Sequence, residues 1–298
     1  MTRLNAKMAV FLSVFLTAAG LVFAQEKINI SGSVEWDTMR INSGVTLDLS
    51  SSGIRLPSGR THAESLLKNG YKSRILQFIM QLQFDSSSTI ADLVSRGEIS
   101  IAEIEAAAET SASVPPSFSS DMRKMQASHS ISISNLSASF IRHRNPAPII
   151  RTLNPVSTAD YTGIIIIAAD ELPVHGMLKK EKPVPCLFPK IWDSEMNLIY
   201  ERNMIDPRSI TMTRYSTLEN IFNKNPSGLS KELLEIAGER PLRIFARGVF
   251  GIKPTDLIID RSDALSIISS EANRSLLSQG KVVIILDESV LRSQFSGE

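Results

Sequence analysis

The chain has 298 residues, with 32 basic and 31 acidic side chains and a formal net charge of +1. A charge this close to zero gives no field that would gather nucleic acid or an anionic membrane surface, and the length is typical of about two domains. Cys186 is the only cysteine, so no disulfide can form within the chain. Because it stands in an apolar, proline-rich stretch, we expect a buried thiol rather than a catalytic one.

The first 24 residues have the three parts of a secretory signal peptide. Arg3 and Lys7 precede an apolar run from Met8 to Val22, and Val22-Phe23-Ala24 stands where a secretory peptidase would cut. The run is too short for a comfortable bilayer span, so we expect cleavage after Ala24 and no transmembrane span in the mature chain. No cysteine follows the run, which removes the site at which bacterial lipoproteins are lipidated. We therefore expect a periplasmic protein.

The next part of the chain predicts strands followed by a long helix. Apolar and polar residues alternate over residues 28–36 and again over 45–49, which is typical of half-buried strands. Apolar residues then recur at three- and four-residue steps from Ala63 to Leu82, which predicts one amphipathic helix of about six turns. Thr61 and Glu64 have the spacing of a capping box at the start of this helix.

Two short helices and a further strand are predicted to complete this unit. Residues 88–94 predict the first helix, and Ser100 and Glu103 form a capping box before the second, over residues 101–110. Pro115 and Pro116 are expected to stop that helix. Alternation resumes over residues 129–140, and its phase slips near Asn135, which predicts a strand with a bulge.

The second half begins with the aliphatic stretch Tyr161–Asp170, which is typical of a central strand covered on both faces. The patterns that follow predict a hairpin over 188–201, helices over 217–222 and 229–237, and strands over 242–249 and 256–259. Ser262 or Asp263 is expected to cap a helix that ends at Gly280. Lys281–Asp287 is expected to be a last buried strand.

The predicted fold class is α+β, with two small mixed α/β domains joined by a proline-containing linker. After a signal peptide over residues 1–24, the domains are expected over 25–142 and 159–298, with the linker over 143–158. The two halves differ in pattern as well as composition, and neither repeats the other.

Acidic residues follow several predicted strands of the second half, at the edge where open α/β sheets bind ligands. They are Asp170, Glu171, Asp260, Asp263, Asp287 and Glu288. Asp170, Asp260 and Asp287 are the candidates to hold a divalent cation or to divide acid and base roles. The alternative is that acids follow strands because they cap helices and solvate turns, which is the commoner role. We assign no catalytic, cofactor-binding or metal-binding residue and expect no cofactor.

Other chemical motifs give no better candidate. The four histidines do not have metal-ligand spacing; they are His62, His129, His143 and His175. The sequence contains no phosphate-binding Gly-Lys-Ser/Thr loop, no dinucleotide-binding glycine fingerprint and no Gly-x-Ser-x-Gly elbow. Aromatic residues interleaved with basic ones, as single-stranded nucleic acid requires, are also missing. We expect a non-enzymatic protein that does not bind nucleic acid.

Four segments of the first half stand in a characteristic order. They are Gly53–Arg60, the long helix with Ala63-Glu64, Asp85–Leu93 and Ser130–Phe140. This order resembles the LPP-type/FlgP-like family of bacterial envelope proteins, except that the family's lipidated cysteine is missing. The resemblance implies an association with the outer membrane or the flagellar motor, and envelope or motor proteins as partners. Self-association to a homo-oligomer is also expected.

The second half contains a further set of ordered segments. They are Tyr161–Ile166, Pro189–Asp193 with Ile199-Tyr200, Ala246–Val249 and Val282–Asp287. This half resembles a domain that accompanies the first in uncharacterised exported proteins. Together the residues and the resemblance predict a structural or assembly component of the cell envelope. The alternative is a secreted enzyme or a metal- or ligand-binding protein that uses Asp170, Asp260 and Asp287.

Overall fold

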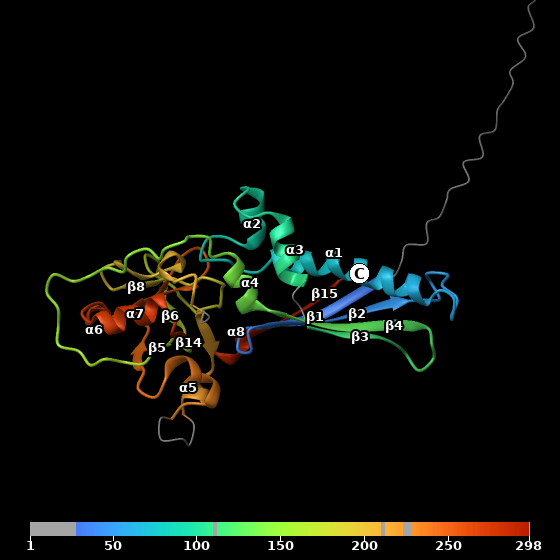
Figure 1. Cartoon of the computed structure of the whole chain (residues 1–298). Helices are drawn as coiled ribbons and strands as arrows, with labels where there is room; N and C mark the ends of the chain where they lie inside the picture. The colour runs from blue at the N-terminus through green and yellow to red at the C-terminus, as the bar shows by residue number, and fades with distance from the viewer. Residues whose placement is uncertain (1–27, 110–111, 210–211, 223–227, 298) are drawn as a thin grey trace, which may run out of the picture.

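The computed structural model of the chain describes residues 28–109, 112–209, 212–222 and 228–297. The predicted signal peptide lies outside the described residues. Figure 1 shows an elongated arrangement in which a long helix covers an extended sheet at one end of the molecule. A parallel sheet and its helices form the other end. Helices and strands are both present, as an α+β fold requires.

Five antiparallel strands form the sheet of the first half, in the order β15-β1-β2-β4-β3. Their bounds are β1 (Ile28–Glu35), β2 (Arg40–Asp48), β3 (Ala112–Phe118), β4 (Lys124–Ser132) and β15 (Arg292–Gly297). The alternation that predicts the first two strands is confirmed, because apolar side chains of β1 and β2 are buried at every second position. The second strand begins earlier than predicted, at Arg40.

Helix α1 (Arg60–Met80) packs on one face of this sheet. Its buried residues follow one another at four-residue steps, and they are Ala63, Leu67, Tyr71, Ile75 and Ile79. The predicted apolar stripe is therefore confirmed. Gly70 lets α1 approach β1, because a Cβ atom at this position would lie 2.3 Å from Cδ1 of Ile28.

The capping box predicted from Thr61 and Glu64 is wrong. Gly59 is the N-cap residue, and no side chain caps α1. Since the helix begins at Arg60, Thr61 already lies within its first turn and is not placed to cap it. Glu64 instead accepts a hydrogen bond from Nε of Arg60 at 2.8 Å.

Helix α3 (Ile101–Glu109) begins with the capping box predicted from Ser100 and Glu103. Helix α2 (Ile90–Ser95) also begins with a capping box, from Thr89 and Asp92, which was not predicted. The Thr89 hydroxyl accepts a hydrogen bond from the Asp92 amide at 3.3 Å, and the Asp92 carboxylate accepts one from the Thr89 amide at 2.7 Å. Each capping box provides hydrogen-bond acceptors for two backbone N–H groups at the helix start, which would otherwise lack partners.

Replacing Thr89 with alanine is expected to lower the free energy of unfolding by about 1 kcal/mol, because the helix then loses its N-cap hydrogen bond. Thr61→Ala is the matched control and should change stability by less than about 0.5 kcal/mol, since Thr61 caps nothing. Urea unfolding of both variants measures the difference. An equal loss in the two variants would contradict the assignment of the cap.

The strand predicted over residues 129–140 is wrong beyond Ser132. Strand β4 ends at Ser132, and helix α4 (Ile133–Ser139) follows directly. The Ser132 hydroxyl accepts a hydrogen bond from the Asn135 amide at 3.2 Å and so caps this helix. The phase slip near Asn135 is thus a change from the two-residue period of a strand to the 3.6-residue period of a helix, and not a bulge.

Pro115 and Pro116 do not merely follow a helix, because they lie inside β3, which the sequence analysis missed. A proline cannot donate a ladder hydrogen bond, and it is tolerated here because β3 is an edge strand. The pairing of β3 with β4 shifts register between Val114 and Ser117, where the two prolines stand.

The second half contains a four-stranded sheet of order β10-β14-β5-β11, in which all neighbours are parallel. Its strands are β5 (Ile164–Ile167), β10 (Arg214–Ser216), β11 (Leu242–Phe245) and β14 (Val282–Ile285). Ile164 and Ile166 join the main hydrophobic core, whereas Ile165 joins a smaller cluster with Leu233 and Val283. The prediction of central strands covered on both faces is therefore confirmed for β5 and β14.

A third sheet has the order β12-β13-β8-β9, and β6 pairs with β7. The bounds are β6 (Leu172–Pro173), β7 (Lys180–Glu181), β8 (Ile191–Asp193), β9 (Leu198–Tyr200), β12 (Gly248–Phe250) and β13 (Asp256–Ile259). The predicted hairpin is confirmed as β8 and β9. The single strand predicted over 242–249 is wrong, because β11 and β12 belong to different sheets.

The remaining helices are short. They are the 3-10 turns η1 (Arg202–Met204) and η2 (Leu218–Ile221), α5 (Lys231–Ala237), α6 (Arg261–Ile268), α7 (Glu271–Ser278) and α8 (Glu288–Leu291). The one helix predicted before Gly280 is in fact two helices, α6 and α7. Asp260, and not Ser262 or Asp263, is the N-cap residue of α6. The Ser270 hydroxyl caps α7 and so starts a new helix.

The C-terminal strand β15 completes the sheet of the first half. It pairs with β1 from Ile30 opposite Gly297 to Glu35 opposite Arg292. The ring of Phe295 stacks on that of Phe78 in α1, with a distance of 4.3 Å between their centroids. Residues that the sequence analysis assigned to the second domain thus pack in the first sheet, and Figure 1 shows the C-terminus beside α1.

Candidate functional site

The structure does not bring the three candidate carboxylates to one sheet edge. Asp170 is exposed after β5, and Asp287 follows the neighbouring strand β14, but Asp260 follows β13, which belongs to another sheet. Asp260 pairs with Arg247 at 2.6 Å, and Asp287 pairs with Lys182 at 3.2 Å. Over the described ranges, no group of three or more His, Cys, Asp or Glu side chains could hold a metal ion.

Asp287 instead caps a helix, which is the commoner role of an acidic residue after a strand. Its Oδ1 atom accepts a hydrogen bond from the Ser289 amide at 2.9 Å, at the start of α8. Hydrogen bonds from the hydroxyl and amide of Ser289, together with Lys182, lower the pKa of this carboxyl to about 2. It therefore stays ionised throughout the physiological range.

Cys186 is buried, as expected, with 0% of its surface exposed. Burial raises the pKa of its thiol far above the ordinary value, so no thiolate nucleophile forms near pH 7. The Tyr215 hydroxyl donates a hydrogen bond to the Cys186 carbonyl oxygen at 2.8 Å and accepts one from its amide at 3.1 Å. The residue therefore belongs to the packed interior.

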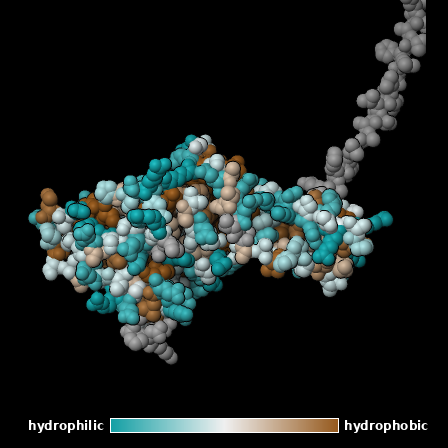
Figure 2. Space-filling view, in the orientation of Figure 1, coloured by the Kyte–Doolittle hydropathy of each residue, from teal (hydrophilic) through white to brown (hydrophobic). Residues whose placement is uncertain are grey.

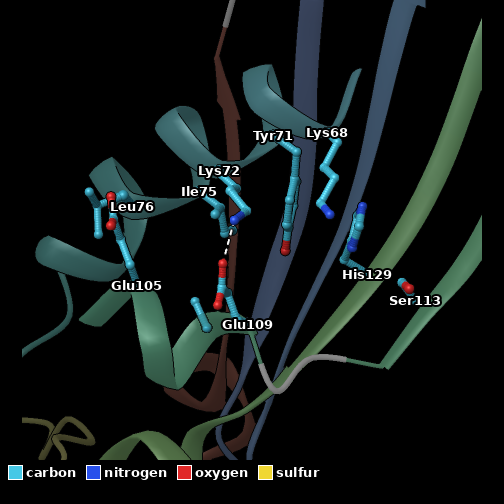
Figure 3. Close-up of a pocket in the computed structure, with 10 residues that line it drawn as sticks. Lys68, Tyr71, Lys72, Ile75, Leu76, Glu105, Glu109, Ser113 and His129 are labelled. Atoms are coloured by element: carbon cyan, nitrogen blue, oxygen red, sulfur yellow. Dashed lines mark hydrogen bonds and ion pairs between the residues drawn. The ribbon is translucent and has the colours of Figure 1, made fainter. Parts of the chain in front are cut away.

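A cavity of about 410 Å³ lies between α1, α3 and the strands β3 and β4 (Figure 3). His129 and Ser113 line it from the sheet. They belong to a row of paired residues in which Gly32 faces Ser43, Ser43 faces His129 and His129 faces Ser113. On the same face of the sheet, the rows on either side of this one contain buried apolar residues. One row holds Ile30, Val45 and Ala127, and the other holds Val34, Ile41 and Ile131. Small polar residues thus interrupt an apolar surface and leave space under the helix.

Two aromatic side chains meet in the lining of this cavity. The Tyr71 ring from α1 stacks on the His129 ring from β4, with 3.7 Å between centroids and 12° between planes. The Ser43 hydroxyl lies 3.4 Å from the Tyr71 hydroxyl and donates to it. Burial raises the pKa of Tyr71 and lowers the pKa of His129, so both groups are neutral at pH 7.

Charged residues surround the cavity on its helical side. Lys72 of α1 forms an ion pair with Glu109 at the end of α3, drawn as a dashed line in Figure 3. Glu105, one helical turn earlier in α3, also lines the cavity. Lys68 has no ion-pair partner within 4 Å in the parts of the chain that the structure describes. The cavity therefore combines the ammonium group of Lys68 and the carboxylate of Glu105 with neutral hydrogen-bonding groups.

This cavity was not predicted from the sequence. Ser43 and His129 stand at positions of β2 and β4 where the alternation places side chains on the buried face of the sheet. A polar residue at such a position was the feature of the sequence that could have indicated a site. The meeting of Ser43 and His129 with Ser113 also depends on β3, which the prolines concealed.

The two edges of the five-stranded sheet differ. The outer edge of β15 is regular, because its pairing with β1 runs over six residue pairs without a shift and contains no proline. The outer edge of β3 carries Pro115 and Pro116 and a register shift. Prolines and bulges protect an edge from pairing with another strand, so of these two edges the β15 edge is the one suited to strand addition.

On the face of the molecule seen in Figure 2, hydrophobic residues are scattered in small groups among polar ones. None of the helices in the described ranges combines the length and the apolar character that crossing a bilayer requires.

The two halves define a two-domain α+β protein. Residues 27–139 match the family model of the N-terminal domain of Treponema pallidum Tp0624, and residues 163–288 match that of its second domain. The two halves of the chain are thus similar to the N-terminal and second domains of one bacterial protein. Neither match links it to the FlgP-like family. A search of curated proteins found no match.

Proposed function

We propose that this protein is a non-enzymatic, exported component of the cell envelope that assembles through the free edge of β15. The observation that carries the proposal is the regular outer edge of this strand, with which no strand in the described ranges pairs. An edge strand presents a row of unpaired backbone N–H and C=O groups, which can pair with a strand of another molecule. A second copy of β15, placed antiparallel, would give a closed two-fold dimer.

The signal-peptide pattern supports export, and the resemblance to envelope proteins supports a location at the outer membrane or the flagellar motor. Charge supports assembly rather than membrane-surface or nucleic-acid binding, since 30 basic and 31 acidic residues remain after residue 24. The separated strand-end carboxylates give no support to the enzymatic alternative.

The purified protein is expected to self-associate, and the double variant Gln294→Lys/Ser296→Lys should weaken this association at least tenfold. Lysines on an edge strand disfavour strand addition, and in a two-fold pairing they would face like charges. Val114→Lys/Ser117→Lys on the protected β3 edge is the matched control and should associate as the wild type does. Size-exclusion chromatography with light scattering measures the mass.

The same variants test the location in cells. A tagged wild-type copy should gather at envelope structures, either at motor sites or round the cell periphery, whereas the β15 variant should spread through the periplasm. A strictly monomeric wild type that also captures no envelope protein would refute assembly. Recovery of the intact N-terminus from the cytosol would refute export.

A further inference from the structure

We propose that the cavity between α1, α3 and the β3–β4 strands binds a small amphipathic carboxylate. The anionic group would lie beside Lys68 and His129, and the apolar part would lie against Leu76 and Ala108. The proposal rests on the cavity itself and does not depend on how the protein assembles.

The end of the cavity near the sheet is suited to a single negative charge. In Figure 3, the side chains of Lys68 and Tyr71 extend from α1 toward His129. The Tyr71 hydroxyl accepts from Ser43, so its own proton remains to be donated, and a neutral imidazole has one N–H donor. The Ser113 hydroxyl lines the same end. One ammonium and several neutral donors match the hydrogen-bonding capacity of a carboxylate.

The charge balance argues against a phosphate dianion. Glu105 and Glu109 also line the cavity, and Glu109 is held ionised because Lys72 lowers its pKa. Since Lys72 is paired with Glu109, the ammonium of Lys68 and the carboxylate of Glu105 remain, and a doubly charged ligand would be repelled more strongly than a monoanion.

The other end of the cavity carries several apolar side chains, with Glu105 beside them (Figure 3). It is lined by Ile75, Leu76 and Ala108, and Ile75 is fully buried against the sheet. Lys68 and Leu76 are eight residues apart in α1, which places their Cα atoms about 12 Å apart along the helix. A volume of about 410 Å³ lies within the range of small-molecule pockets. The ligand would therefore be elongated, with its charge at one end.

Isothermal titration of the purified protein with octanoate tests the proposal, with octanol as the uncharged probe. Octanoate should bind, and octanol should bind at least tenfold more weakly. Lys68→Met should reduce octanoate affinity at least tenfold, because it removes the ammonium while keeping an unbranched side chain suited to a helix. The matched control is Lys124→Met, at an exposed position of β4 outside the cavity. It should bind as the wild type does.

A second variant tests the place of binding. Ser113→Trp on the exposed edge strand should fill the cavity and abolish octanoate binding, while the far-UV spectrum shows that the fold is retained. Equal affinity for octanoate and octanol, unchanged binding by Lys68→Met, or no octanoate binding to the wild type would each overturn the proposal. None of these outcomes bears on assembly through β15, which the mass measurement tests separately.

Discussion

Replacing Asp256 with alanine is expected to lower the free energy of unfolding by about 3 kcal/mol, because several buried donors lose their acceptor together. Asp256 is only 1% exposed, at the start of β13. Its carboxylate accepts hydrogen bonds from the Ser86 hydroxyl at 3.0 Å, the Trp192 indole at 3.3 Å and the Lys190 amide at 3.3 Å. Ser86 belongs to the first half of the chain, so the loss also weakens the junction between the halves.

Asp256→Asn is the matched control, and it should cost less because an amide oxygen can still accept hydrogen bonds. Urea unfolding of both variants measures the difference. If alanine and asparagine were equally destabilising, the charge and not the set of hydrogen bonds would be the important feature of Asp256.

The pH dependence of stability gives an independent check on Asp256. Burial raises the pKa of its carboxyl above the ordinary value of 3.8. The folded state therefore keeps this proton to a higher pH than the unfolded state does. The stabilisation from the proton is fully present below pH 3.8 and is lost as pH rises through the raised pKa. Relative to Asp256→Asn, the wild type should lose stability across this window.

Replacing Trp36 with alanine is expected to cost about 3–5 kcal/mol, the range for a large buried aromatic residue. Trp36 is 5% exposed, and its ring meets the Tyr215 ring edge-on with 5.7 Å between centroids. Tyr215 lies in β10 of the parallel sheet, so this contact also joins the two halves. Trp36→Phe should retain most of the stability, because an aromatic ring still fills part of the space.

Thermal unfolding monitored by calorimetry measures both Trp36 variants. The wild type should unfold in one transition, because residues of both halves share one hydrophobic core cluster. A wild type with two separate transitions, or an alanine variant as stable as the phenylalanine one, would contradict the view that Trp36 holds the halves together.

Aromatic and cationic side chains add to the same junction. Phe84 of the first half lies 4.9 Å from Phe188 of the second half, between ring centroids, and the Arg202 guanidinium lies over both rings. The Lys253 amide donates a hydrogen bond to the Ser86 carbonyl at 2.9 Å. These contacts fix the two halves relative to each other.

Helices and strands whose apolar residues repeat regularly along the chain were predictable from the sequence. The alternation of β1 and the four-residue stripe of α1 record which side of each element is buried, because burial repeats with the geometry of the element itself. The aliphatic strands β5 and β14 were predicted for the same reason, since both of their faces are covered. The capping box at Ser100 was predictable because the helix begins directly after the cap.

Elements whose existence depends on a distant partner were not predictable in this way. Strand β15 is mostly exposed and has no clear alternation, and it is a strand because β1 lies beside it. Strand β3 tolerates two prolines because it lies at an edge, and the sequence does not state which strand that is.

The sequence alone determined the two-part α+β organisation, the amphipathic face of α1 and the inert setting of Cys186. Tertiary structure decided which strands share a sheet, and hence that Asp260 lies apart from Asp170 and Asp287. It also brought Lys68, Tyr71 and His129 to one cavity. The physical reason is that burial periodicity is encoded by neighbours along the chain, whereas register and strand order depend on pairings between residues far apart in sequence.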